Sequence, residues 1–191
     1  MLAYMHTDKT VEALCIMSLP IYLIGARGCG KTTIGKILSK TLNYEFKDTD
    51  HYIQIITHCN IAEIIKNEGW HAFRLREMHA LRAVTALSTV VATGGGIVLS
   101  EKNCDFMRQN GKVIWLNASS VILGERLKNE PNLAQRPTLT GRTITEEIDD
   151  VLHQRMELYY QTSHYQVDAT QSPTYIIKQI LDLLDLNNNT I

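Results

Sequence analysis

The amino-acid sequence predicts an α/β domain in which a five-stranded parallel sheet carries helices on both faces. Two observations lead to this prediction. From residue 20 onward, short apolar runs alternate with longer amphipathic segments, and this alternation is typical of parallel sheets with crossover helices. A glycine-rich segment also separates the first apolar run from the first amphipathic one. Because ligands of such sheets bind beyond the carboxyl ends of the strands, functional residues are expected there.

The expected elements follow one another in regular order. Buried strands are expected at residues 21–24, 44–47, 89–92, 112–116 and 165–167. Helices are expected at 31–42 and at 145–160. A mostly helical stretch is expected between the second strand and about residue 87, with a break near 57–60, and a further helix is expected to follow the fourth strand and to end at residue 127. Ser172 and Pro173 provide an N-cap and a proline at the first position for a last helix. Residues 128–142 are polar, contain two of the four prolines and are expected to form a lid loop.

The composition excludes several classes of protein. A length of 191 residues fits one domain, and a hydrophobic fraction of 45% allows a sizeable core. The net charge of −1 argues against a nucleic-acid partner, which normally needs a basic stripe. The four cysteines have no C-x-x-C spacing, and the histidines form no H-E-x-x-H pair, so reduced thiols are expected and no zinc site.

The N-terminal segment is not expected to cross or enter a membrane. The apolar stretch before residue 24 is interrupted by Glu12 and Pro20, and no segment approaches the roughly 18 apolar residues of a spanning helix. Residues 1–16 differ in character from the rest and are expected to be a flexible extension or the product of an upstream start codon. Residues 17–191 are expected to form a single domain, and the protein to be a cytoplasmic monomer.

A phosphate-binding loop is the strongest motif in the chain. Gly25 to Thr32 reads G-x-x-x-x-G-K-T and stands between an expected strand and an expected helix. Backbone N–H groups of such a loop and the helix N-terminus surround the phosphates of a nucleotide. Lys31 is expected to bridge the β- and γ-phosphates of ATP, and the Thr32 hydroxyl to bind Mg²⁺. The predicted ATP-binding residues in this loop are Gly28, Cys29, Gly30, Lys31, Thr32 and Thr33.

Two readings remain for the cysteine inside this loop. A thiol near a helix N-terminus can have a lowered pKa and a redox role. Cys29 can instead be a small residue that the loop tolerates, and this interpretation is favoured.

Two carboxylates follow the second expected strand. Asp48 and Asp50 are two positions apart, so on an extended strand both would point to one side, toward the phosphate loop. One carboxylate could hold the hydration shell of Mg²⁺, and the other could orient or deprotonate an acceptor hydroxyl. An acidic turn without a function is the alternative.

Five segments, in the same order along the chain, resemble those of the shikimate kinases. Their amino-acid sequences look most like those of the type II enterobacterial isozyme. The resemblance covers residues 17 to about 186. The segments are the phosphate loop followed by Asp48-Thr-Asp50, then Phe73-Arg-Leu-Arg-Glu77, Val91-Ala-Thr-Gly-Gly-Gly96, Arg136-Pro-Thr-Leu-Thr-Gly141 and Arg155-Met-Glu-Leu-Tyr159.

The resemblance implies a three-layer P-loop kinase fold with a substrate-binding segment and a lid. The implied reaction is ATP + shikimate → ADP + 3-phosphoshikimate, with one Mg²⁺ per subunit. The implied catalytic residues are Lys31, Asp50 and Arg136, and the metal ligands are Thr32 and Asp48. The implied shikimate-binding residues are Asp50, Arg74, Gly94, Gly95, Gly96 and Arg155.

The chemistry of the substrates agrees with these implied roles. Arginine offers a planar fork for the shikimate carboxylate, and Glu77 stands three residues after Arg74, where it can hold the guanidinium. Arg136 is implied to reach the transferring phosphoryl group, and Arg126 to pack against the adenine. The segment 168–173 is implied to line the adenine pocket through its backbone.

Three rival functions agree less well with the sequence. Gluconate kinases and nucleoside monophosphate kinases share the loop but lack the combined D-T-D, F-R-x-x-E and T-G-G-G segments. A P-loop switch or ATPase module would need an N-K-x-D or ABC signature, which the sequence does not contain. A catalytically inactive shikimate-binding homologue is disfavoured, because Lys31, Asp50 and Arg136 are all present.

Overall fold

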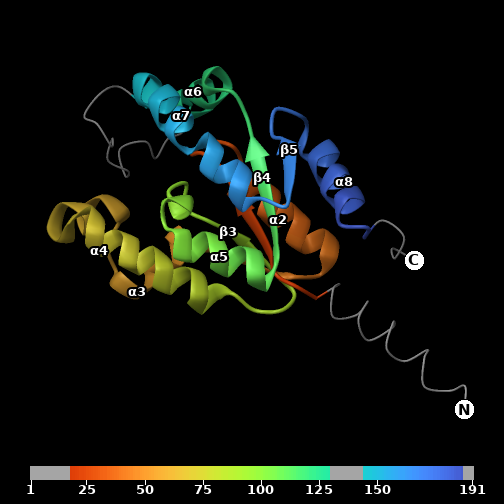
Figure 1. The fold of residues 1–191 in the computed structure, drawn as a ribbon, viewed down its shortest axis with the longest axis horizontal. Helices are drawn as coiled ribbons and strands as arrows, with labels where there is room; N and C mark the ends of the chain where they lie inside the picture. Colours follow the sequence, from red (N-terminus) through yellow and green to blue (C-terminus); the bar gives the residue numbers. More distant parts are fainter. Residues whose placement is uncertain (1–17, 130–143, 187–191) are drawn as a thin grey trace, which may run out of the picture.

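The computed structural model describes residues 18–129 and 144–186 (Figure 1). The expectations for residues 1–16, and for most of the lid including Arg136, lie outside these described residues. Within them, no helix is both long enough and apolar enough to cross a bilayer.

Five parallel strands form the sheet, in the order β2-β3-β1-β4-β5. This confirms the predicted sheet. The strands are β1 (Ile21–Ile24), β2 (Glu45–Asp48), β3 (Thr89–Ala92), β4 (Lys112–Asn117) and β5 (Tyr165–Asp168). β1 pairs with β3 on one side and with β4 on the other, so the phosphate loop that follows β1 leaves the middle of the sheet.

Helices follow the strands and cover the sheet. They are α2 (Lys31–Leu42), α3 (Thr49–Thr57), α4 (Ile61–Val84), α5 (Glu101–Asn110), α6 (Ser120–Lys128), α7 (Ile144–Thr162) and α8 (Pro173–Leu183), with a 3₁₀ turn η1 (Ile97–Leu99). α3 packs against β2 and α4 packs against α3. α8 lies beside β5 on the other side of the molecule (Figure 1).

Alternate side chains of the central strand enter two separate cores. Ile21 and Leu23 belong to a core with apolar residues of α2, α6 and α8. Tyr22 and Ile24 belong to a core with residues of α4, α5 and η1. Because neighbouring residues of a strand point to opposite faces, a strand buried on both faces must be apolar throughout. The three-layer arrangement therefore follows from the uninterrupted apolar run of β1.

Helix α5 and the turn η1 were not predicted from the sequence. Only Asn103 and Met107 of α5 are fully buried, Cys104 and Phe106 are partly buried, and the other residues of the helix are polar. A helix that touches the core at so few positions has little apolar periodicity to reveal it. The other predicted elements are confirmed to within two or three residues at their ends, the last helix beginning at Pro173.

Candidate active site

The phosphate loop has the backbone that its glycines allow. Gly30 is the N-cap of α2 and has φ of 97°, a left-handed conformation that glycine adopts without strain. Gly25 has φ of 140°, and a Cβ there would lie 2.5 Å from the carbonyl oxygen of Leu116. The loop therefore closes tightly against β4, with the N-terminus of α2 at its end. Such an N-terminus is a favourable place for an anion.

The ammonium group of Lys31 lies within this loop. Its Nζ donates to the carbonyl oxygens of Gly25 and Ala26, both at 2.8 Å, and lies 3.6 Å from Sγ of Cys29. Cys29 is only 1% exposed and packs in the core beneath the loop. Packing thus accounts for Cys29, in line with the favoured interpretation of a tolerated small residue.

Thr32 and Asp48 face each other across the mouth of the loop. The Thr32 hydroxyl donates to Oδ2 of Asp48 at 2.9 Å. The other oxygen, Oδ1, accepts from the backbone N–H groups of Asp50 and His51, at 3.0 and 3.2 Å, so Asp48 also caps α3. One geometric expectation was wrong. β2 ends at Asp48 and Asp50 lies in the first turn of α3, so the two carboxylates do not share one side of a strand.

This pair of oxygens fits Mg²⁺. Mg²⁺ prefers oxygen ligands, keeps several waters and is usually held by one or two protein groups together with nucleotide phosphates. The residues that the structure describes contain no cluster of three or more acidic, histidine or cysteine side chains suited to a metal. The hydroxyl of Thr32 and the carboxylate of Asp48 match a site of this shared kind.

A cavity extends from the phosphate loop toward β5. Its lining includes the loop from Arg27 to Thr33, Asp48, Asp50, Arg126, Ala169, Gln171 and Pro173. The Arg126 guanidinium donates to the carbonyl oxygen of Ala169 at 2.8 Å and to that of Gly28 at 3.5 Å. Arg126 therefore ties α6 to both ends of this cavity. Ala169, Gln171 and Pro173 of the segment 168–173 contribute to the wall.

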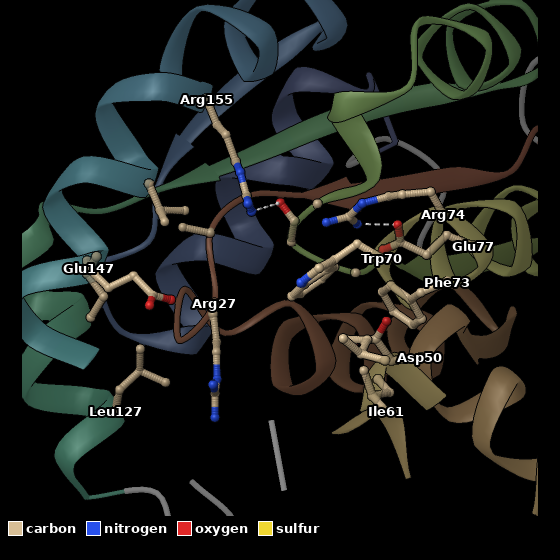
Figure 2. A pocket seen from close by; sticks show the side chains of 17 residues that line it. Arg27, Asp50, Ile61, Trp70, Phe73, Arg74, Glu77, Leu127, Glu147 and Arg155 are labelled. Carbon is tan, nitrogen blue, oxygen red and sulfur yellow. Dashed lines mark hydrogen bonds and ion pairs between the residues drawn. The ribbon is translucent and has the colours of Figure 1, made fainter. Parts of the chain in front are cut away.

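A second cavity lies beside the first, between α4, α7 and the glycines that follow β3 (Figure 2). Its lining includes the predicted residues Asp50, Arg74, Gly94, Gly95, Gly96 and Arg155. Arg27, Asp50 and Ile61 line both cavities. A group transferred from one cavity to the other would therefore pass Asp50 and Arg27.

Arg74 is held firmly at the wall of the second cavity. It forms an ion pair with Glu77, as the spacing predicts. Its Cζ lies 5.2 Å from the ring centroid of Trp70 and 5.6 Å from that of Phe73, close enough for cation–π attraction. A Cβ at Gly96 would lie 2.7 Å from Cζ of Arg74, so only glycine leaves room for the guanidinium.

The carbonyl oxygen of Gly95 anchors the opposite wall. It accepts from Nη1 of Arg155 at 3.2 Å and from the hydroxyl of Tyr159 at 2.6 Å. Tyr159 is fully buried and stacks on Trp115, and this burial raises its pKa, so it remains a neutral donor. Two residues one turn apart on α7 thus fix the glycine segment to that helix.

Asp50 and Glu77 converge on Gly94. A Cβ at Gly94 would lie 2.7 Å from Oδ1 of Asp50 and 2.8 Å from Oε1 of Glu77, so a side chain there would displace both carboxylates. The Gly94 N–H donates to Oγ1 of Thr49 at 3.0 Å, which fixes the glycine beside α3. Burial raises the pKa of Glu77 to about 7, with a further rise from Asp50, while Arg74 opposes the shift.

The sequence model of the shikimate kinase family matches residues 27–185. The chain belongs to this family. It is 52% identical to shikimate kinase 2 of Erwinia tasmaniensis over 170 residues, which cover 89% of this chain and 98% of that protein. It is also 52% identical to shikimate kinase 2 of Yersinia pestis over 168 residues, covering 88% and 97% of the two chains.

Solved shikimate kinases share the fold. The enzyme from Acinetobacter baumannii, in complex with shikimate, superposes with a TM-score of 0.83 at 32% identity, covering 94% of this chain and 99% of that one. The shikimate kinase from Aquifex aeolicus gives 0.73 at 28% identity, covering 90% and 99%. A gluconokinase from Sinorhizobium meliloti gives 0.52 at 14% identity, covering 88% and 93%, and this likeness shows the fold alone.

Sequence reasoning missed several residues of the second cavity, among them three that are polar or aromatic. Arg27, Trp70 and Glu147 line the second cavity but were not predicted to do so. Arg27 occupies a variable position of the loop motif, so the motif gives no reason to select it. Trp70 stands four residues before Arg74, a spacing that places both on one helix face and could have revealed it. Glu147 is buried on α7. Other acidic residues stand next to it in the sequence, so the sequence gives no reason to select it.

Proposed function

We propose that this chain transfers the γ-phosphoryl group of ATP to the 3-hydroxyl of shikimate, giving ADP and 3-phosphoshikimate. The observation that carries the proposal is the pair of cavities that meet at Asp50 and Arg27. One is built on the phosphate loop and the other on two arginines. Membership of the shikimate kinase family supports the same reaction, as does the relative whose structure contains shikimate.

The first cavity is proposed to hold ATP. Backbone N–H groups from Gly28 to Thr33 would surround the phosphates, and Arg126 would lie near the adenine. The Lys31 ammonium would exchange its carbonyl partners in the loop for phosphate oxygens, which are stronger charge-assisted partners. Thr32 and Asp48 would hold Mg²⁺. The bound ion neutralises charge on the phosphate oxygens.

The second cavity is proposed to hold shikimate. Arg74 and Arg155, from opposite walls, would clamp its carboxylate, because each guanidinium offers a planar pair of donors. The backbone from Gly94 to Gly96 would approach the ring without side chains in the way. This leaves the 3-hydroxyl toward Asp50, at the boundary with the nucleotide cavity.

Transfer then needs little covalent chemistry from the protein. The 3-oxygen forms a bond to the γ-phosphorus while the bond from that phosphorus to the β,γ-bridging oxygen breaks, and ADP leaves with the electron pair. Asp50 would orient the hydroxyl and accept its proton. Lys31 and Arg136 would stabilise the charge on the phosphoryl oxygens, and a lid over residues 128–142 would exclude water.

We further propose that residues 17–191 act as one domain and as a cytoplasmic monomer, without nucleic-acid or membrane partners. The net charge of −1 supports the exclusion of nucleic-acid partners. Light scattering after size-exclusion chromatography measures the oligomeric state directly.

An ADP-release assay with shikimate, gluconate and nucleoside monophosphates in parallel tests the reaction. We expect release with shikimate. Lys31→Met and Arg136→Ala should abolish it without changing the circular dichroism spectrum. Arg74→Ala and Arg155→Ala should each raise the shikimate KM by about tenfold or more, since each removes one partner of a desolvated charge pair. Release with gluconate but not with shikimate would contradict the proposal.

A further inference from the structure

The wall of the acceptor cavity contains a break in helix α4. Gly69 has φ of 81° and ψ of 170°, a combination that is almost confined to glycine, and it separates residues 61–68 from residues 70–84. Both parts line the cavity, the first through Ile61 and Ile65 and the second through Trp70 and Arg74 among others. The placement of one part relative to the other therefore sets the shape of the cavity.

An ion pair joins the two parts across this break. Nε and Nη2 of Arg76 donate to both carboxylate oxygens of Glu68, at distances of 2.7 to 2.9 Å. In an uninterrupted helix, residues eight positions apart lie about 12 Å apart along the axis. A two-pronged contact between them therefore depends on the change of direction at Gly69. Both side chains are partly exposed, 36% for Arg76 and 38% for Glu68, and they lie outside the described lining of the cavity.

Trp70 connects the break to the arginine of the acceptor cavity. It follows Gly69 directly, and its ring packs edge-on against Phe73 with the centroids 6.0 Å apart. The Arg74 guanidinium lies over the same indole, at 5.2 Å (Figure 2). Movement of the second part of α4 relative to the first would thus carry Trp70 and Arg74 together.

We propose that the Arg76–Glu68 ion pair positions the acceptor-binding wall: by bridging the break in α4, it holds Trp70 and Arg74 where bound shikimate needs them. Arg76 and Glu68 are positioning residues, since they act through side chains that reach the cavity. The proposal rests on the proposed function for the identity of the acceptor. The bridge itself is a property of the free protein.

Steady-state kinetics of Arg76→Ala, Glu68→Ala and the double variant test the proposal. Each single change should raise the shikimate KM about two- to fivefold, the range that an exposed ion pair provides. The kcat and the ATP KM should stay the same, and the double variant should be no worse than either single one. Arg76→Lys keeps the charge but not the fork, so it should restore the KM only in part.

Two comparisons separate this role from a general effect of charge. Lys66→Ala removes an exposed cation from the first part of the same helix, and it should leave the shikimate KM unchanged. In about 1 M salt, where exposed charges are screened, the ratio of the Arg76→Ala KM to the wild-type KM should fall toward one.

Tryptophan emission of the free protein tests the bridge independently of the reaction. Arg76→Ala and Glu68→Ala should shift the emission, and the shift should vanish in a Trp70→Phe background, because Trp115 is buried in the core. If shikimate were not the acceptor, this shift would still appear. The proposal is overturned if the single variants keep the wild-type emission or the wild-type shikimate KM. It is also overturned if the effects of the two single changes on KM add in the double variant, or if kcat falls as KM rises.

Discussion

Arg74 is constrained from several directions before any acceptor binds. Glu77 pairs with its guanidinium, the rings of Trp70 and Phe73 lie within cation–π distance, and the missing side chain of Gly96 leaves space for it. A side chain already held in its binding position loses little conformational freedom when a ligand arrives. The affinity for the proposed carboxylate ligand should therefore depend on the groups around Arg74 as well as on the arginine.

Gly96→Ala should displace this arginine. A Cβ at that position would lie 2.7 Å from Cζ of Arg74, and the guanidinium would have to move. We expect the shikimate KM to rise about tenfold or more, with the ATP KM unchanged, in steady-state assays. Adding Arg74→Ala to this variant should cause little further loss, since both changes remove the same contact. A normal KM for Gly96→Ala would show that the guanidinium is placed differently.

Glu77→Gln should change how stability depends on pH. The folded pKa of about 7 lies above the ordinary value of 4.5, so the folded state binds the proton more tightly than the unfolded state does. This contribution is fully present below pH 4.5 and is lost as the pH rises through 7. We therefore expect wild type to lose up to about 3 kcal/mol of unfolding free energy relative to Glu77→Gln between pH 5 and 8. Urea unfolding at a series of pH values measures this loss. Parallel curves of unfolding free energy against pH for the two proteins would refute the prediction.

Residue types could be predicted from the sequence where a motif specifies both chemistry and spacing. Lys31 and Thr32 belong to a motif that fixes both the residue types and their spacing, and Glu77 lies one helical turn from Arg74. The convergence of Asp50 and Glu77 on Gly94 could not be predicted, because it depends on how α3, α4 and the end of β3 pack together. No local pattern carries that information.

At the scale of elements, prediction succeeded where burial is continuous. β1 and β3 are buried at every position, so their apolar runs stand out from the surrounding sequence. The break in α4 was not predicted, because a glycine within an otherwise helical pattern is often tolerated without one. The wrong placement of Asp50 has a similar cause: the end of β2 is set by the capping bonds of Asp48, which the strand pattern does not reveal.

His164 joins the end of α7 to the start of β4 and should make this junction sensitive to acid. Its Nδ1 accepts from the Val113 N–H at 3.0 Å, so the neutral ring completes the contact. Burial, together with Arg108 and Lys112, lowers the pKa of His164 below its usual 6.5. In acid the unfolded state therefore binds more protons, and stability falls as the pH drops below about 6.5.

The comparison of two histidine variants isolates this effect. His164→Gln does not titrate, so the stability advantage of wild type over it should shrink between pH 7 and 5 in urea unfolding. His153→Gln alters an exposed histidine on α7 and serves as the matched control for the substitution itself. If the stability advantage of wild type over His164→Gln grew in acid, the folded state would favour the protonated ring of His164.

At the scale of the whole molecule, the two cavities are arranged for separate loading. The phosphate loop and the segment after β5 form most of the nucleotide side, whereas α4, α7 and the glycines after β3 form the acceptor side. Only Arg27, Asp50 and Ile61 appear in the described linings of both. Each ligand can therefore find most of its contacts without the other.

Thermal-shift measurements with each ligand alone check this independence. A ligand at about 100 times its Kd stabilises the folded state by about 2.7 kcal/mol. ADP with Mg²⁺ and shikimate should each raise the melting temperature of wild type. Lys31→Met should lose the shift with ADP and keep the shift with shikimate, and Arg155→Ala should show the reverse. Loss of both shifts in either variant would mean that the two sides form only together.

The boundary formed by Arg27, Asp50 and Ile61 also matters for inhibitor design. A single molecule that joins a nucleotide to a cyclic carboxylate through a short tether could occupy both compartments at once. Binding of its second half would be intramolecular, and the tether could raise affinity by about two to four orders of magnitude over either half if its length matches the gap. The tether would have to pass Asp50 without adding a negative charge beside that carboxylate. A neutral linker is therefore the better starting point than one that imitates the full polyphosphate.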